Sequence, residues 1–429
     1  MTPLFPTSIA QGPWIGTRTD RKDETMPEST LWNRRFVFLL LAQAGFGFAH
    51  SSFMMLPKYL ATELAAGPEE IGSVVAVSAV SIVVFLIPAG SMVDRHGRKQ
   101  FLAAGAALMA LASAGYVYVH EIGAFLYALR LLQSVAFAYA FAGGAALCVD
   151  AAPPHRLGQA VGLFGLSYVV MGAFAPAAVE AIVERAGWDA SFLLASGAAG
   201  WCLLLSLFVR EDPIDHGEAK HVPFYAIVAR PEIAWSIAIV GLLGIAFGCA
   251  MNFYQPYALS LGLTELRDFF IANSLAAASC RLALGPFIDR IGLRLVSIVS
   301  LAFYAVVLFS MTWLDQIGLP ALGLAMGLAH GLFYPAYTGI LLQNCPPAER
   351  GRRMSIIQAG LNLGIGLGGA ALGWTAARWG YPVIFQFSTA ALLLAAYLVA
   401  WTTRPANTTS ARDSALAGEA PFREVKEPG

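Results

Sequence analysis

The chain has 429 residues, 57% of them hydrophobic and 13% charged, and its 27 basic residues equal its 27 acidic residues in number. A soluble domain carries roughly 25% charged residues. This composition, with a mean hydropathy of +0.63, therefore excludes an ordinary water-soluble protein and favours a protein that lies in lipid. The zero net charge gives no global field that would favour nucleic acid as a partner.

A helix that crosses the ~30 Å of membrane hydrocarbon needs ~20 mostly apolar residues. Twelve segments of the chain meet this criterion, so we expect an all-α integral membrane protein. In chain order these spans are residues 36–57, 70–93, 101–119, 122–148, 158–182, 188–209, 233–257, 267–288, 295–314, 318–345, 353–377 and 382–402.

The spans divide the chain into two six-helix bundles, residues 33–209 and 233–403. A polar segment, residues 1–32, precedes the first bundle. Residues 210–232 are too short for a domain and are expected to link the bundles. Residues 404–429, rich in Ala, Thr, Ser and charge, have the composition of a disordered tail.

Lys and Arg are distributed unequally between the two sides of the predicted helices. Alternate loops on one side hold twelve: Arg95, Arg98, Lys99, Arg156, Arg210, Lys220, Arg230, Arg290, Arg294, Arg350, Arg352 and Arg353. The other side holds four: Lys58, Arg185, Arg267 and Arg378. Basic loops stay in the cytoplasm, and an even span count puts both termini there. We expect a multi-pass protein of a bacterial inner (plasma) membrane.

The two halves repeat one another. The sequence GSMVDRHGRK at residues 90–99 returns as GPFIDRIGLR at residues 285–294, an offset of 195. A second set returns at an offset of 193: Pro153, Pro154, Gly158, Gly187 and Phe192 match Pro346, Pro347, Gly351, Gly380 and Phe385. Six spans per copy give both halves the same orientation, as in carriers built from parallel repeats.

The chain resembles the major facilitator superfamily over nearly all of residues 33–403. Residues 90–99 are similar to that family's loop motif G-x-x-x-D-R-x-G-R-[KR], and RLLQS at 130–134 is similar to its R-x-x-Q-G motif, with Ser134 in place of glycine. The resemblance implies twelve helices in two parallel-related bundles and the function of a drug-exporter-like secondary transporter.

The loop motif predicts a gate at the cytoplasmic side. A carboxylate at a helix C-terminus is unfavourable unless a helix N-terminus lies against it. The resemblance implies that Asp94 lies against the helix starting near Met354, and Asp289 against the helix starting near Gly158. We expect Arg98 and Lys99 to pair with Asp150. The gate set is Gly90, Asp94, Arg95, Gly97, Arg98, Lys99, Asp150, Gly285, Asp289, Arg290 and Arg294.

A simpler interpretation of these loops is that their basic residues only fix the orientation of the helices in the membrane and that their acidic residues are solvated. In the second copy Leu293 replaces the first basic residue, so that gate should be weaker.

Polar side chains inside the spans are candidates for the transport pathway. An arginine deep in the bilayer usually faces a cavity or a partner, and helical spacing gathers several other polar residues on single faces. The predicted pathway set is His50, Arg130, Gln133, Asn252, Gln255, Arg281, His330, Tyr334, Tyr337, Gln358 and Asn362. The alternatives are structural bonds between helices or to backbone carbonyls and, for Arg281, a place in the cytoplasmic gate.

Glycines at 360, 364, 368, 369 and 373 give the small-xxx-small spacing that lets membrane helices pack closely. The five cysteines are expected to be packing residues, since none has metal-ligand spacing. The chain holds no GxxxxGK[ST] phosphate loop, so we expect no bound cofactor or metal and an ion gradient as the energy source.

We therefore expect a monomeric carrier, not an enzyme, that exports a small amphipathic compound through the bilayer. Family exporters that exchange substrate for protons carry a motif close to G-x-x-x-G-P-x-x-G-G in the fifth helix. Here the proline is present as Pro176, but Glu180 occupies the position of the last glycine. Proton coupling through Asp150, Glu180 or His50 thus stays open. The alternatives are a facilitator or importer of an organic anion, and a non-transporting assembly factor or sensor.

Overall fold

The computed structural model describes residues 31–153, 156–211, 228, 230–283, 290–343, 345 and 347–403. At positions 91, 94, 281–283, 316 and 347–352 it describes the backbone alone. Throughout these ranges the regular structure is helical, without strands.

The first half contains α1 (Arg34–Ser52), the short 3-10 helix η1 (Phe53–Met55), α2 (Leu56–Thr62), α3 (Pro68–His96), α4 (Arg98–Gly115), η2 (Tyr116–Tyr118), α5 (Ala124–Ala151) and α6 (Leu157–Phe208). The second half contains α8 (Pro231–Ser260), α9 (Arg267–Ala283), α11 (Leu293–Ser310), η4 (Met311–Trp313), α12 (Leu314–Ile317), α13 (Leu319–Leu342), α14 (Pro347–Trp379) and α15 (Tyr381–Thr402).

Ten helices of the described residues are long and apolar enough to cross a membrane. One of them, α6, has 52 residues and is interrupted at Gly187, where φ is 78° and ψ is 177°, so it makes two spans. The 17 described residues of α9 make the twelfth. The predicted turn between residues 182 and 188 is thus a single glycine. The eleventh span, predicted to start at residue 353, covers Arg353–Trp379, and α14 itself begins earlier, at Pro347.

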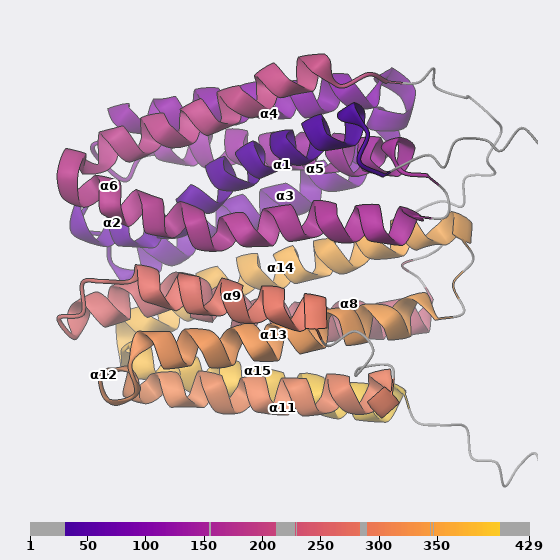
Figure 1. The fold of residues 1–429 in the computed structure, drawn as a ribbon. Helices are drawn as coiled ribbons and strands as arrows, with labels where there is room; N and C mark the ends of the chain where they lie inside the picture. Colours follow the sequence, from indigo (N-terminus) through magenta and orange to yellow (C-terminus); the bar gives the residue numbers. More distant parts are fainter. Residues whose placement is uncertain are drawn as a thin grey trace, which may run out of the picture.

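Figure 1 shows two groups of roughly parallel helices, α1–α6 and α8–α15, stacked on each other. We call the end at which α1 begins and α15 ends the terminal end, and the opposite end the distal end. The groups meet where α14 packs on α3 and where α6 packs on α9.

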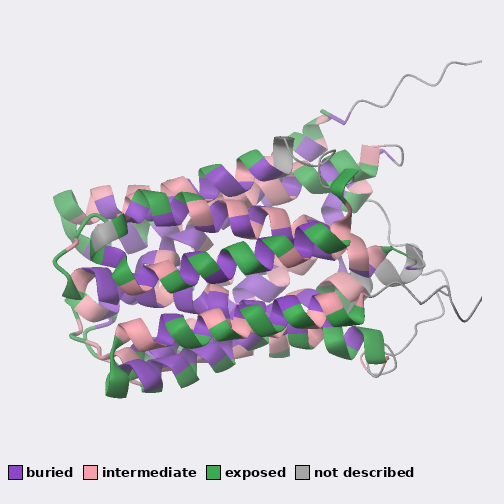
Figure 2. Cartoon of the chain, turned by 90° about the horizontal axis from the view of Figure 1, so that it is seen from below, coloured by how far each residue is buried: buried purple, intermediate pink, exposed green. Residues whose placement is uncertain are grey.

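The helices cover their outer faces with apolar side chains. Leu111, Phe174 and Val306 are each more than 60% exposed, and Figure 2 shows exposed residues in stripes along helices whose other faces are buried. Large exposed apolar surfaces are unfavourable in water, so this distribution fits helices surrounded by lipid.

The duplication is confirmed by backbone geometry. Gly97 and its repeat partner Gly292 adopt φ of 108° and 97°, and Gly187 and its partner Gly380 adopt φ of 78° and 83°. Side chains with a Cβ rarely tolerate these left-handed values. Both copies therefore turn sharply between successive helices at matching glycines.

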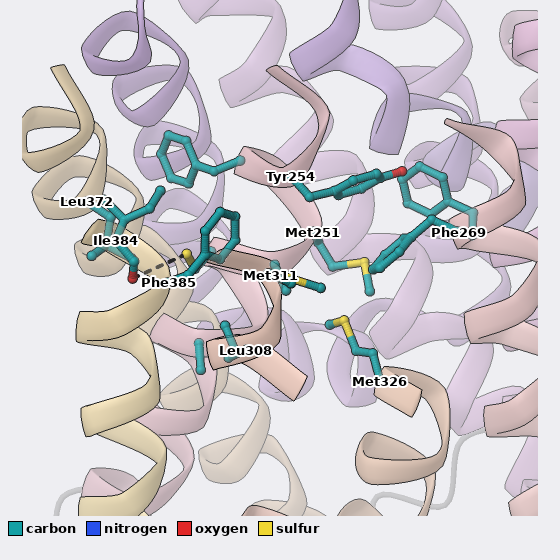
Figure 3. Close-up of a cluster of buried hydrophobic side chains, with 14 of the residues drawn as sticks. Met251, Tyr254, Phe269, Leu308, Met311, Met326, Leu372, Ile384 and Phe385 are labelled. Carbon is teal, nitrogen blue, oxygen red and sulfur yellow. Dashed lines mark hydrogen bonds between the residues drawn. The ribbon is translucent and has the colours of Figure 1, made fainter. Parts of the chain in front are cut away.

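A large apolar core runs through the second half and continues into the first. Tyr254 of α8 stacks on Phe269 of α9, with ring centroids 4.2 Å apart, and Met251 lies beside them (Figure 3). The buried Cys249 thiol donates to the carbonyl of Ile384 at 3.7 Å. This core fixes α8, α9 and α15 relative to one another and so positions the contacts with the first half.

Candidate functional site

At the distal end, a carboxylate of the first half binds the start of a helix of the second half. Glu180 of α6 is 1% exposed and accepts hydrogen bonds from the N–H groups of Leu266, at 3.1 Å, and Arg267, at 2.8 Å. The Lys58 ammonium of α2 donates to the same carboxylate and, at 2.9 Å, to the carbonyl of Thr264. Anions are favourable at a helix N-terminus. We call these five residues the carboxylate contact.

A second contact between the halves is made by glycines of α3 and α14. A Cβ added at Gly72 would lie 2.3 Å from the carbonyl oxygen of Gly369, and one added at Gly373 would lie 2.6 Å from that of Pro68. One added at Gly366 would lie 2.7 Å from the Val80 side chain. The backbones therefore touch without side chains between them. We call this the glycine contact.

A separate row of glycines on α14 packs inside the second half. A Cβ at Gly364 would lie 2.0 Å from the carbonyl oxygen of Gly241, and those at Gly360 and Gly368 would lie within 3.0 Å of α8. The predicted packing role of these glycines is confirmed. Their spacing did not show that α14 uses two rows, one for each half.

The predicted pathway residues of the first half form one polar cluster. Nδ1 of His50 lies 2.8 Å from the Tyr168 hydroxyl. Arg130 donates to Oε1 of Gln133 at 2.9 Å, and the Tyr116 hydroxyl donates to the same oxygen at 3.1 Å. Nε of Arg130 and Nε2 of Gln133 are buried donors without an acceptor among the described residues. The cluster is therefore rich in donors.

The predicted residues of the second half are more dispersed. Nε2 of Gln255 donates across the halves to the carbonyl of Met54 at 2.7 Å. The His330 ring lies 4.9 Å from that of Phe247, and Tyr334 lies 6.0 Å from His330.

Two further members of the predicted set, Asn252 and Asn362, bond within their own helices, whereas Tyr337 of α13 also reaches Ser236 of α8. Asn252 donates to the carbonyl of Gly248, and Asn362 donates to that of Gln358, both at 2.9 Å. Tyr337 stacks on Phe333. The side chain of Arg281 lies outside the described residues.

At the terminal end, Arg98 of α4 forms the predicted ion pair with Asp150 of α5. The expected pairing of Lys99 with Asp150 is wrong, because the Lys99 ammonium donates to the carbonyl of Leu207 at 2.7 Å. Sequence reasoning missed Glu211, whose carboxylate accepts from the N–H groups of Arg98 and Lys99 and so caps α4. Its position 112 residues from Lys99 gave no local signal.

The second copy of the loop motif keeps one of these bonds. Arg294 donates to the carbonyl of Ala400 at 3.0 Å, which repeats the bond from Lys99 to Leu207 at the end of the other half. At the offset of 195, Leu293 replaces Arg98 and the buried Cys345 replaces Asp150. The second copy therefore has apolar or uncharged residues where the first has an ion pair.

The rest of the predicted gate is only partly described. Arg95 and Arg290 are exposed, and no described atom lies within 4 Å of a Cβ built at Gly90. The Asp94 side chain, Gly285 and Asp289 lie outside the described residues.

A family model for the major facilitator superfamily matches residues 37–280 and 257–428. The chain belongs to the major facilitator superfamily. It is 23% identical over 370 residues to the staphylopine export protein of Staphylococcus aureus, covering 80% of this chain and 91% of that one. It is 24% identical over 326 residues to the multi-drug resistance efflux pump PmrA of Streptococcus pneumoniae, covering 73% and 81%.

Among solved structures, the nucleoside transporter NupG superposes with a TM-score of 0.71 at 13% identity, covering 86% of this chain and all of that one. This superfamily member is thus a membrane transporter by family, and its twelve helices form two parallel-related six-helix bundles.

Proposed function

We propose that this superfamily member is a secondary carrier that works by alternating access and exports a small amphipathic compound. The observation that carries the proposal is the closure of the distal end by the carboxylate and glycine contacts, made between two duplicated halves. Contacts between rigid halves can separate without unfolding either bundle. The efflux proteins among the relatives support the direction of transport.

In this proposal the polar cluster around His50, Arg130 and Gln133 binds substrate from the first half. Gln255, His330 and Tyr334 contribute from the second half. Aromatic rings beside His50 and His330 suit the apolar part of an amphipathic compound.

We place the terminal end in the cytoplasm, because the loops there carry most of the Lys and Arg. Both termini then lie on the cytoplasmic side of a bacterial inner membrane, and the distal end faces outwards. A monomer with no bound cofactor, driven by the proton gradient, is the simplest carrier of this kind. The Arg98–Asp150 ion pair belongs to the cytoplasmic gate.

A second candidate is transport of an organic anion. It is favoured by the buried Nε of Arg130 and Nε2 of Gln133, two donors that a carboxylate oxygen of a substrate would satisfy. Buried donors without acceptors are unfavourable, so a ligand rich in acceptors would bind well here.

Purified full-length protein in proteoliposomes, with an imposed pH gradient and an internal pH dye, tests both candidates against hydrophobic cations and organic anions. Substrate-dependent proton movement that disappears in Arg130→Ala supports proton-coupled transport. Preference for anions supports the second candidate. Absence of flux for every compound contradicts both and favours the assembly-factor or sensor alternative.

A further inference from the structure

A cleft of about 1070 Å³ opens at the terminal end of the first half. It lies where α1 begins, α5 ends and α6 ends, away from the polar cluster of the proposed pathway. Four basic side chains and two acidic ones line it: Arg34, Arg35, Lys99, Arg210, Asp150 and Glu211. Its described lining therefore carries two more positive than negative charges.

Both acids of the cleft already have partners. Asp150 pairs with Arg98, which is not itself among the lining residues, and lies 3.9 Å from the guanidinium of Arg35, which is one of them. Glu211 accepts from the backbone N–H groups at the start of α4. Arg34 and Arg210 are exposed. The positive charges of Arg34 and Arg210 are consequently available to an anion from outside, whereas Arg35 pairs with Asp150 and Lys99 donates to Leu207.

One side of the cleft is apolar and lies on the outer, lipid-facing surface of the helices. Leu207 and Phe208 at the end of α6 are 57% and 60% exposed, and the Phe38 ring of α1 lies 6.0 Å from that of Phe208. Val37 and Leu41 continue the exposed apolar surface along α1. A ligand in the cleft can therefore have both an anionic group and a long apolar chain.

We propose that this cleft binds the headgroup of an anionic phospholipid, with its acyl chains along the exposed faces of α1 and α6. Basic pockets between membrane helices are suited to such headgroups. The apolar wall favours a lipid over a soluble anion of the same charge, because only a lipid uses both parts of the site. The site is separate from the polar cluster of the pathway, although its lining includes Lys99 and Asp150 of the predicted gate, and the proposal does not depend on what the protein carries.

The test is native mass spectrometry of the full-length protein in detergent, titrated separately with phosphatidylglycerol, phosphatidylcholine and glycerol 3-phosphate. We expect phosphatidylglycerol to bind most tightly and the double variant Arg34→Ala/Arg210→Ala to weaken it by about 30-fold, taking the typical effect of two basic residues near an anionic surface. Arg34→Lys/Arg210→Lys, which keeps the charge, should bind within about threefold of the original chain.

The matched control is Arg290→Ala, which removes an exposed arginine from the same end of the other half and should leave phosphatidylglycerol binding unchanged. Equal affinity for phosphatidylglycerol and phosphatidylcholine, or an unaltered double variant, overturns the site. Glycerol 3-phosphate binding as tightly as the lipid overturns the lipid assignment and indicates a soluble anion. The thermal midpoint in phosphatidylcholine verifies that each variant is folded.

Discussion

Two of the contacts that join the halves at the distal end, the carboxylate contact and the glycine contact, use opposite chemistry. Where α6 meets α9, the buried Glu180 binds Lys58 and two backbone N–H groups. Where α3 meets α14, Gly72 and Gly369 bring two backbones together with no charge. Charge-assisted bonds depend strongly on direction and partner, whereas backbone packing depends only on shape.

This difference predicts how each contact behaves when the halves separate. When the carboxylate contact opens, the Glu180 carboxylate loses the N–H groups of Leu266 and Arg267 as partners. The contact therefore resists opening until this charge is hydrated or binds another partner. The glycine contact loses only packing. We therefore expect the carboxylate contact to set the stability of the closed distal end, and the glycine contact to set how closely the helices approach.

The largest effect is expected for Glu180→Ala. It leaves the Lys58 ammonium and the N–H groups of Leu266 and Arg267 without their acceptor, and breaking a buried pair in this way costs about 3–5 kcal/mol. The closed distal end should become a minor state. Labelling of Leu266→Cys, whose side chain is fully buried in the closed state, by a membrane-impermeant thiol reagent measures this, and Glu180→Ala should label at least tenfold faster. Equal labelling rates in the two backgrounds contradict the assignment.

Gly72→Leu should have the next largest effect, because its Cβ would overlap the carbonyl oxygen of Gly369. Overpacking costs about 1–3 kcal/mol, so the thermal midpoint of the purified protein should fall. Gly197→Leu is the matched control, since no described atom lies within 4 Å of a Cβ there. Similar losses in both variants would show that the effect comes from the glycine itself and not from the contact.

Gln255→Leu should have a smaller effect, although Gln255 also bridges the halves. Its bond to Met54 contributes about 1 kcal/mol, but its Oε1 is buried without a partner among the described residues, and leucine removes that unfavourable group. We expect a net change within about 1 kcal/mol in denaturant unfolding. A loss comparable to that of Glu180→Ala would mean that Gln255, not Glu180, dominates the closure.

Arg378→Ala should change least. Arg378 lies 3.9 Å from Glu69 across the halves, but both side chains are largely exposed, and such pairs contribute about 0–1 kcal/mol. The guanidinium also lies 3.9 Å from the Trp374 ring centroid on its own helix, which holds it locally. Thiol labelling of Leu266→Cys in this background should match the parent, and strongly accelerated labelling would contradict a minor role.

The sequence was sufficient for the fold but only partly for these contacts. Repeated glycines predicted both the duplication and the close packing of α14, because glycine spacing is a local signal. Glu180 was visible as a departure from an exporter motif, and Lys58 as one of few basic residues on its side. The contact between Glu180 and Lys58 was not predictable from the sequence. The other donors to Glu180 are backbone N–H groups of Leu266 and Arg267, and a pattern of side chains does not reveal backbone donors.

The polar residues inside the spans show the same limit. Helical spacing placed His330 and Tyr334 on one face, and the structure brings their rings together. Spacing could not distinguish a pathway residue from one that bonds to its own helix, as Asn252 and Asn362 do. Only the packing of neighbouring helices makes that distinction.

The most direct test of the central claim is a spin-label distance across the distal end, with labels at Glu121→Cys and Ile317→Cys on opposite halves, in full-length protein reconstituted in lipid. The account predicts a single narrow distance distribution in the parent and a shift towards longer distances in Glu180→Ala. Glu180→Gln, which keeps the size of the side chain, should give an intermediate distribution. An unchanged distribution in Glu180→Ala would contradict the claim that the carboxylate contact holds the two halves closed.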